Sequence, residues 1–84
     1  MKTTSLISLH QKAIKTLEAI ETAESRIRHH QSEIPKIDKL WRSTVEPRLR
    51  ERIEINTRII SRLSIIYSNL LVRIITISET QIND

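Results

Sequence analysis

The stretch SRLSIIYSNLLVRIITIS, residues 61–78, decides what kind of fold this chain can adopt. More than half of its side chains are aliphatic or aromatic, and they are not confined to one face of a helix. Arg62, Asn69 and Arg73 interrupt it. A helix that is apolar on most sides must be buried on several sides. This stretch must therefore be surrounded either by lipid or by other helices.

A bilayer span requires about 20 predominantly apolar residues. Only residues 63–72 separate Arg62 from Arg73, and this interval still includes serine and asparagine. An arginine at the centre of a bilayer costs about 2.5–3.5 kcal/mol. We therefore do not expect a membrane role, and we predict that other helices surround the stretch.

The same stretch belongs to a longer heptad pattern, in which seam positions follow one another in steps of four and three. Such an a/d seam, sustained for about four repeats, is typical of a coiled-coil-like helix. It predicts a helix from about residue 44 to about residue 79, followed by a frayed tail over residues 80–84. Ile59 and Ile66 widen the seam on one flank, and Leu71 widens it on the other. The seam consists of Leu49, Ile53, Asn56, Ile60, Leu63, Tyr67, Leu70, Ile74 and Ile77.

An earlier apolar stripe recurs every seven residues from Leu6 to Ile34 and predicts a first helix over about residues 4–33. Pro35 should end or kink that helix, because proline lacks the amide donor and disfavours helical geometry in the residue before it. We expect a connection over about residues 34–43. A reversal is favoured because it lets the two stripes bury each other, and a kinked rod within a multi-chain bundle is the alternative.

The start of the second helix carries the pattern Ser43-Thr44-Val45-Glu46, which resembles a capping box. Pro47 would then fall in the first turn, where a missing amide is tolerated. A helix of this length measures roughly 54 Å, whereas a compact globule of this size has a diameter of only about 30 Å. We therefore predict an all-α, elongated two-helix hairpin with a coiled-coil-like seam, which completes a multi-helix bundle by oligomerisation. The predicted oligomer interface is the nine-residue seam together with Ile59 and Ile66.

The composition excludes several classes of function. The chain of 84 residues has neither Gly nor Cys, which removes glycine-rich phosphate loops, thiolate catalysis and cysteine zinc sites. No candidate nucleophile lies beside a base, so we expect no enzyme, no cofactor and no small-molecule substrate. His29 and Glu33 share a helical face, but a metal site needs three or four ligands, and we predict none. The lack of Cys and of a signal-peptide pattern suggests a cytoplasmic location.

Basic residues exceed acidic residues by 14 to 10, and the arginines are concentrated in the middle of the chain. Glu46 with Arg50, and Glu54 with Arg58, have the i, i+4 spacing of helix-surface ion pairs. Arginines at the rim of a protein interface are therefore the favoured interpretation. The alternative is phosphate binding along the Arg48–Arg62 face. The candidate contact residues for a partner or a nucleic acid are Trp41, Arg42, Arg48, Arg52, Arg62 and Arg73.

Two single residues leave alternatives open. Trp41, near the expected bend, either closes the end of the hairpin or is an exposed contact for a partner. Asn56, on the seam, either specifies register and oligomeric state or lies near a splayed, solvated end. Together these features predict a non-enzymatic structural or adaptor protein that associates with itself or with other helical proteins. A small basic DNA- or RNA-binding protein is the alternative.

Overall fold

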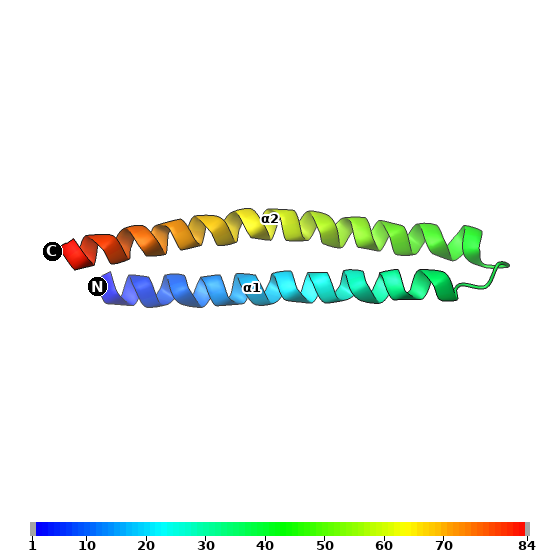
Figure 1. The fold of residues 1–84 in the computed structure, drawn as a ribbon, viewed down its shortest axis with the longest axis horizontal. Coiled ribbons are helices and arrows are strands. Elements are labelled where there is room, and N and C mark those ends of the chain that lie inside the picture. The colour runs from blue at the N-terminus through cyan, green and yellow to red at the C-terminus, as the bar shows by residue number, and fades with distance from the viewer. Residues whose placement is uncertain (1, 84) are drawn as a thin grey trace.

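The computed structural model describes residues 2–83 of the chain, and the side chains of residues 6–80. Its elements are helix α1 (Lys2–Glu33), a short 3-10 helix η1 (Ile34–Lys36) and helix α2 (Arg42–Asn83). The two long helices run antiparallel, with the chain ends together at one end of the molecule (Figure 1). The prediction of an all-helical hairpin is confirmed, and the connection is a reversal rather than a kink.

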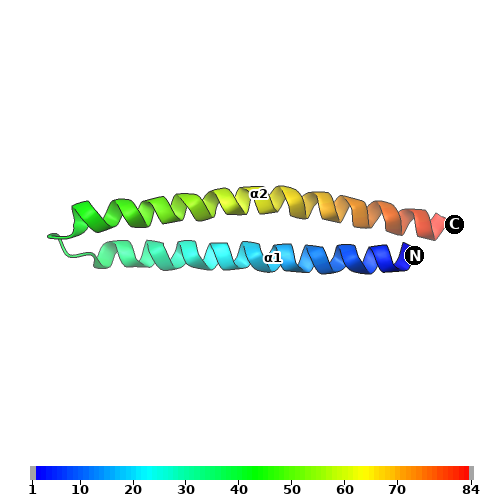
Figure 2. The same cartoon turned by 180° about the vertical axis from the view of Figure 1, so that it is seen from behind.

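The hairpin is a single layer of two helices that measures 67 × 15 × 14 Å, with a Cα radius of gyration of 19.1 Å. A compact chain of this length would have a radius of gyration of about 12 Å. The view from behind shows that α1 covers one side of α2 along almost its whole length (Figure 2). The predicted elongated shape is confirmed, and the other sides of α2 are open in this single chain.

Pro35 lies in the reversal, as the second residue of η1, two residues after α1 ends at Glu33. The amide of Ile37 donates to the carbonyl of Ile34 at 3.3 Å, which closes the single turn of η1. Ile37 itself is extended, with φ −69° and ψ 128°. The chain therefore leaves the helical path at the place that the missing amide of proline predicts.

Helix α2 begins at Arg42, before the expected start at about residue 44. The carbonyl of Trp41 accepts hydrogen bonds from the amides of Thr44 at 3.1 Å and Val45 at 2.8 Å, and so opens the helix. The capping-box interpretation of residues 43–46 is wrong, because those residues already lie within the first turns. Pro47 consequently lies inside α2 rather than in its first turn.

The C-terminal end of α2 also differs from the expectation. The helix continues to Asn83, beyond the predicted end at about residue 79. Of the predicted frayed tail, residue 84 lies outside the described residues.

The core lies between α1 and α2, and it is best formed at the end where the termini meet. Every one of the nine seam residues of α2 is buried or half-buried. Leu9 and Ala13 of α1 pack against Leu70 and Ile74 of α2 in the central cluster. Small side chains such as Ala13 let two helices approach closely, while the larger residues opposite fill the space between them. Leu6, Tyr67 and Ile77 pack against this cluster.

The seam therefore faces α1 of the same chain. Its predicted role as a contact between chains remains a prediction, and within one hairpin α1 occupies it. The flank residues Ile59 and Ile66 remain exposed.

Candidate functional site

Helix α2 presents an unusual number of large apolar side chains outside the seam. Ile65 is 64% exposed and Val72 is 61% exposed, although both belong to the most apolar part of the chain. Single exposed apolar residues need no explanation, but a contiguous set indicates an interaction surface. The exposed set on α2 is Ile55, Ile59, Ile65, Ile66, Leu71, Val72 and Ile75.

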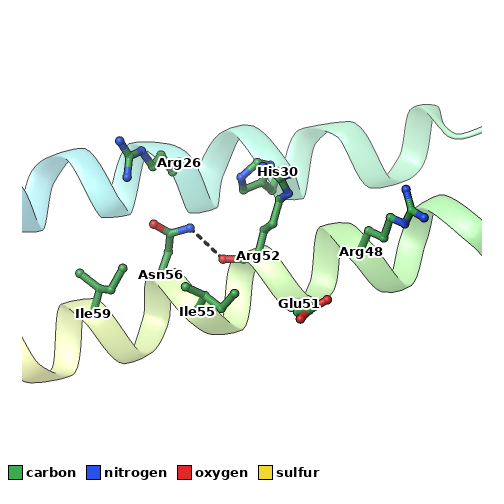
Figure 3. A pocket seen from close by; sticks show the side chains of 8 residues that line it. All are labelled: Arg26, His30, Arg48, Glu51, Arg52, Ile55, Asn56 and Ile59. Carbon is green, nitrogen blue, oxygen red and sulfur yellow. Dashed lines mark hydrogen bonds between the residues drawn. The ribbon is translucent and has the colours of Figure 1, made fainter.

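One flank of the hairpin contains a groove of about 720 Å³ between the two helices. Figure 3 shows Arg52 extending from α2 toward α1 and His30, while Glu51 points away from α1 at the edge. Isoleucine side chains line the groove beside these charged groups. We call this surface the basic groove, and its lining residues are Arg26, His30, Arg48, Glu51, Arg52, Ile55, Asn56 and Ile59.

Two groups of arginines differ in their ion pairs. Arg50 binds Glu46 at 2.7 Å, and Arg58 binds Glu54 at 2.6 Å, as their spacing predicted. Within the part of the chain that the structure describes, no ion pair involves an arginine of the basic groove. That second group consists of Arg26, Arg48 and Arg52. The groove therefore carries positive charge that the hairpin does not neutralise.

Asn56 forms the base of the groove and is only 7% exposed. Its Nδ2 donates to the carbonyl of Arg52 at 2.8 Å, one turn earlier in the same helix. Its Oδ1 is buried and has no donor among the described residues. A buried acceptor without a donor costs about 1–3 kcal/mol. The alternative that Asn56 lies at a splayed, solvated end is wrong, because both helices cover it.

A second surface lies on the opposite flank, near the open end where the termini meet. The helical repeat places Leu17 on the side of α1 opposite Arg26, and Leu71 lies on the seam flank opposite Ile59 and Ile66. The packing of Leu9 and Ala13 against residues 70 and 74 brings these parts of the two helices level. We call this surface the open-end patch. It consists of the exposed residues Ile7, Ile14, Leu17, Leu71 and Ile75.

Trp41 lies at the tip of the hairpin, next to the reversal. It is 58% exposed and its neighbour Leu40 is 77% exposed, so Trp41 does not close the end of the hairpin. Trp41 lines a shallow hollow with Ile37, Val45 and Leu49. This position leaves its indole available as a contact for another molecule.

The other predicted contact residues lie on different surfaces. Arg42 lies at the tip, where it lines a separate shallow hollow with Lys39. Arg62 and Arg73 are exposed, and their spacing from Ile59 and Ile66 continues the flank of the basic groove along α2. The structure thus joins Arg48 and Arg52 in one groove and places Arg42 apart from them.

Four residues of the basic groove did not appear in the sequence-based prediction, namely Arg26, His30, Glu51 and Ile55. Arg26 and His30 belong to α1, and only the reversal brings them next to residues 48–59. His30 occupies the seam face of α1, which the stripe indicated, but its neighbours across the seam depend on the pairing of the helices. Its ring lies edge-on to His29, with centroids 5.7 Å apart. No cluster of three or more metal-ligating side chains occurs among the described residues.

By length and composition, α2 also contains one stretch that could cross a membrane. Within residues Arg42–Thr80 the mean hydropathy of an 18-residue window reaches 1.4, and 11% of that window is buried in the hairpin. A core helix of a water-soluble protein, which is mostly buried, can have the same length and hydropathy. Arg62, Asn69 and Arg73 place polar groups within the apolar part of this helix.

Over its described residues, the hairpin presents exposed apolar side chains on α2 and a groove whose arginines form no ion pair within the hairpin. Comparison with known protein families, with curated proteins and with solved structures finds no match to this chain.

Proposed function

We propose that this chain is a non-enzymatic structural or adaptor protein that acts by association of helices. The observation that carries this proposal is the set of large apolar side chains that α1 leaves exposed on α2. A two-stranded hairpin covers one stripe of α2, whereas the helix is apolar on several sides. Additional helices would remove these side chains from water, at about 25 cal/mol for each Å² of apolar surface.

The open-end patch is the surface on which a second copy fits best. Leu71 and Ile75 lie level with Ile7 and Ile14 within one chain, as the packing at the open end requires. If the two copies are related by a two-fold axis parallel to the long axis of the hairpin, these residues lie at the same height along that axis in both copies. Leu71 would then contact Ile7 and Ile14 of the second copy, and the reciprocal contact would follow by symmetry. The result is a four-helix bundle.

Shape and charge support the same arrangement. One face of the hairpin, 67 by 15 Å, has an outline area of about 1,000 Å², so a contact that starts at the open-end patch and continues along most of this face would reach the ~800 Å² per partner of a stable interface. The flank of α2 that carries Leu71 also carries Ser61, Ser64 and Ser68, whose small side chains permit close approach. A two-fold contact through the basic groove would instead place arginines against arginines.

The test is the molar mass of the purified chain, measured by light scattering over a concentration series at low and high salt. We expect a dimer that persists at high salt, because apolar burial is not screened by ions. A monomer at all concentrations would refute self-association and would leave an adaptor that binds only other proteins.

Nucleic-acid binding is the second candidate, and the unneutralised arginines of the basic groove favour it. Phosphate contacts would make the affinity fall steeply as salt rises, by roughly one power of the salt concentration for each phosphate neutralised. Titration of a labelled single-stranded or duplex oligonucleotide over a salt series tests this candidate.

A further inference from the structure

The basic groove has a chemical character that distinguishes it from a simple phosphate-binding surface. Arg26 and His30 on α1 line the groove together with Arg48 and Arg52 on α2, and exposed Ile55 and Ile59 lie beside them. Phosphate groups would pair with the arginines but would leave the isoleucines in water. The groove therefore fits a ligand that has both negative charge and apolar side chains.

Arginine and isoleucine side chains also lie next to one another along α2 beyond the groove. The flank residues follow one another at helical spacings of three, four and seven, which makes a second seam beside the one that α1 occupies. This second seam extends over about 32 Å, the length of six turns of helix. It consists of Arg52, Ile55, Ile59, Arg62, Ile66 and Arg73.

We propose that the basic groove and this second seam bind an acidic amphipathic helix of another protein. The partner helix would place Leu, Ile or Val against Ile59 and Ile66, and Glu or Asp on either side, within reach of Arg26, Arg52 and Arg62. Charge complementarity of this kind gives specificity and orients the partner. An apolar centre with charged flanks is the general arrangement of helix-in-groove recognition.

A second copy of the chain does not meet these requirements in a two-fold contact, because the same arginines would face one another. The inference deepens the proposed adaptor function, since it names the partner class of one surface. It does not depend on self-association through the open-end patch, which lies on the opposite flank. The two claims can therefore fail separately.

The probe is a labelled three-heptad peptide with Leu at positions a and d and Glu at positions e and g. Fluorescence anisotropy gives its affinity for the full chain at low and high salt. A matched peptide with Lys in place of Glu should bind at least about tenfold more weakly, because it repels the arginines. A Glu peptide with Ser in place of Leu should also bind more weakly. Equal binding of the Glu and Lys peptides would overturn the proposal.

Substitutions on the chain test the charged part of the groove. Arg52→Gln with Arg62→Gln should weaken binding of the Leu/Glu peptide by about tenfold or more. The control, Arg50→Gln with Arg58→Gln, removes the same charge from arginines that are paired elsewhere, and should change the affinity less than about twofold. Equal losses in both pairs of variants would show a general effect of net charge and would overturn the assignment of the groove.

A second pair of variants tests the apolar part. Ile59→Ser should weaken binding of the peptide, whereas Ile65→Ser, which removes an exposed isoleucine outside the groove, should not. Single-stranded DNA serves as the competing polyanion. If DNA displaces the peptide and Ile59→Ser has no effect on either ligand, the groove is a polyanion site and the helix proposal is wrong.

Light scattering and circular dichroism of every variant complete the test. We expect the helix content and the molar mass to remain those of the starting chain. A groove variant that lowers the molar mass of the free chain would identify the occupant as a second copy and would overturn the proposal. A chain that is monomeric throughout yet binds the Leu/Glu peptide would refute self-association alone.

Discussion

The side-chain nitrogen of Asn56 donates to the backbone carbonyl of Arg52 at 2.8 Å, one turn earlier in α2. This bond orients the amide, because only its nitrogen can donate to a carbonyl. The oxygen is then buried between the helices without a donor among the described residues. Asn56 is thus a polar group in a mostly apolar seam, and its single hydrogen bond lies within its own helix.

Replacement of Asn56 by Leu should stabilise the hairpin by about 1–3 kcal/mol, since it removes the buried acceptor and fills the seam with apolar volume. Urea denaturation followed by circular dichroism measures the change. Asn69→Leu is the control, because Asn69 is exposed on the same helix. A lower stability for Asn56→Leu than for the starting chain would show that the amide oxygen has a partner in solution.

Truncation of Leu70 to Ala should lower the free energy of unfolding by about 2–5 kcal/mol, because Leu70 belongs to the central cluster. Truncation of Ile65 should cost at most about 0.5 kcal/mol within one hairpin, because it lies on the open side of α2. Thermal melts of both variants test this contrast. Equal losses would place Ile65 in a core that a second chain supplies.

Introduction of a charge into the open-end patch should dissociate the proposed dimer. In Leu71→Glu the carboxylate would face Ile7 and Ile14 of the second copy, where it has no partner, and the cost of its desolvation opposes association. We expect the starting chain to melt at a temperature that rises with concentration, and the variant to melt at one that does not. Val72→Glu, an exposed position behind the seam, is the matched control. The proposed interface is wrong if both variants keep the mass of the starting chain.

The ion pair between Glu54 and Arg58 should contribute little to stability despite its short distance. Its carboxylate and guanidinium are 62% and 71% exposed, so water and salt screen the attraction. Glu54→Gln should cost about 0.3–0.5 kcal/mol at low salt, and the difference should vanish in 1 M salt as the Debye length falls to about 3 Å. A loss above about 1 kcal/mol would place this pair in a buried interface.

The apolar composition of α2 permits a direct test for lipid binding. With vesicles of neutral phosphatidylcholine, we expect the chain to stay in the supernatant after sedimentation, because Arg62 and Arg73 oppose insertion. Binding to anionic vesicles that salt reverses would reflect the net charge of +4 alone. Sedimentation with neutral vesicles at high salt would show that α2 embeds in lipid, and our expectation would then be wrong.

The periodicity of the chain predicted the hairpin well, because helix formation and the burial of a stripe are local properties. Each residue of the second-helix seam is buried or half-buried, and Pro35 lies in the reversal. The start of α2 was predicted less well. Ser43 and Glu46 have the right residue types for a capping box, but the carbonyl of Trp41 opens the helix earlier. The start depends on which backbone carbonyl accepts the first helical hydrogen bonds, and the side-chain pattern alone does not specify that carbonyl.

The surfaces could be predicted only in part. Ile59 was predicted as a flank residue, and Arg48 and Arg52 as candidate contact residues, because all three belong to one helix with a regular repeat. Arg26 was not, since its place beside them depends on which residues of α1 lie level with them. The burial of Asn56 was likewise undecided, because an amide on a seam is buried only if the helices stay together at that level.

By itself the sequence determined two long helices, the stripe that each one buries and the break between them, since these follow from the spacing of apolar residues and the missing amide of proline. Only the tertiary structure decided between the favoured reversal and a kinked rod, placed Arg26 and His30 in one groove with Arg48 and Arg52, and brought Ile7 and Ile14 level with Leu71. The physical reason is that a helical repeat specifies the face of a residue, whereas its neighbours across an interface depend on how two helices pair along their length.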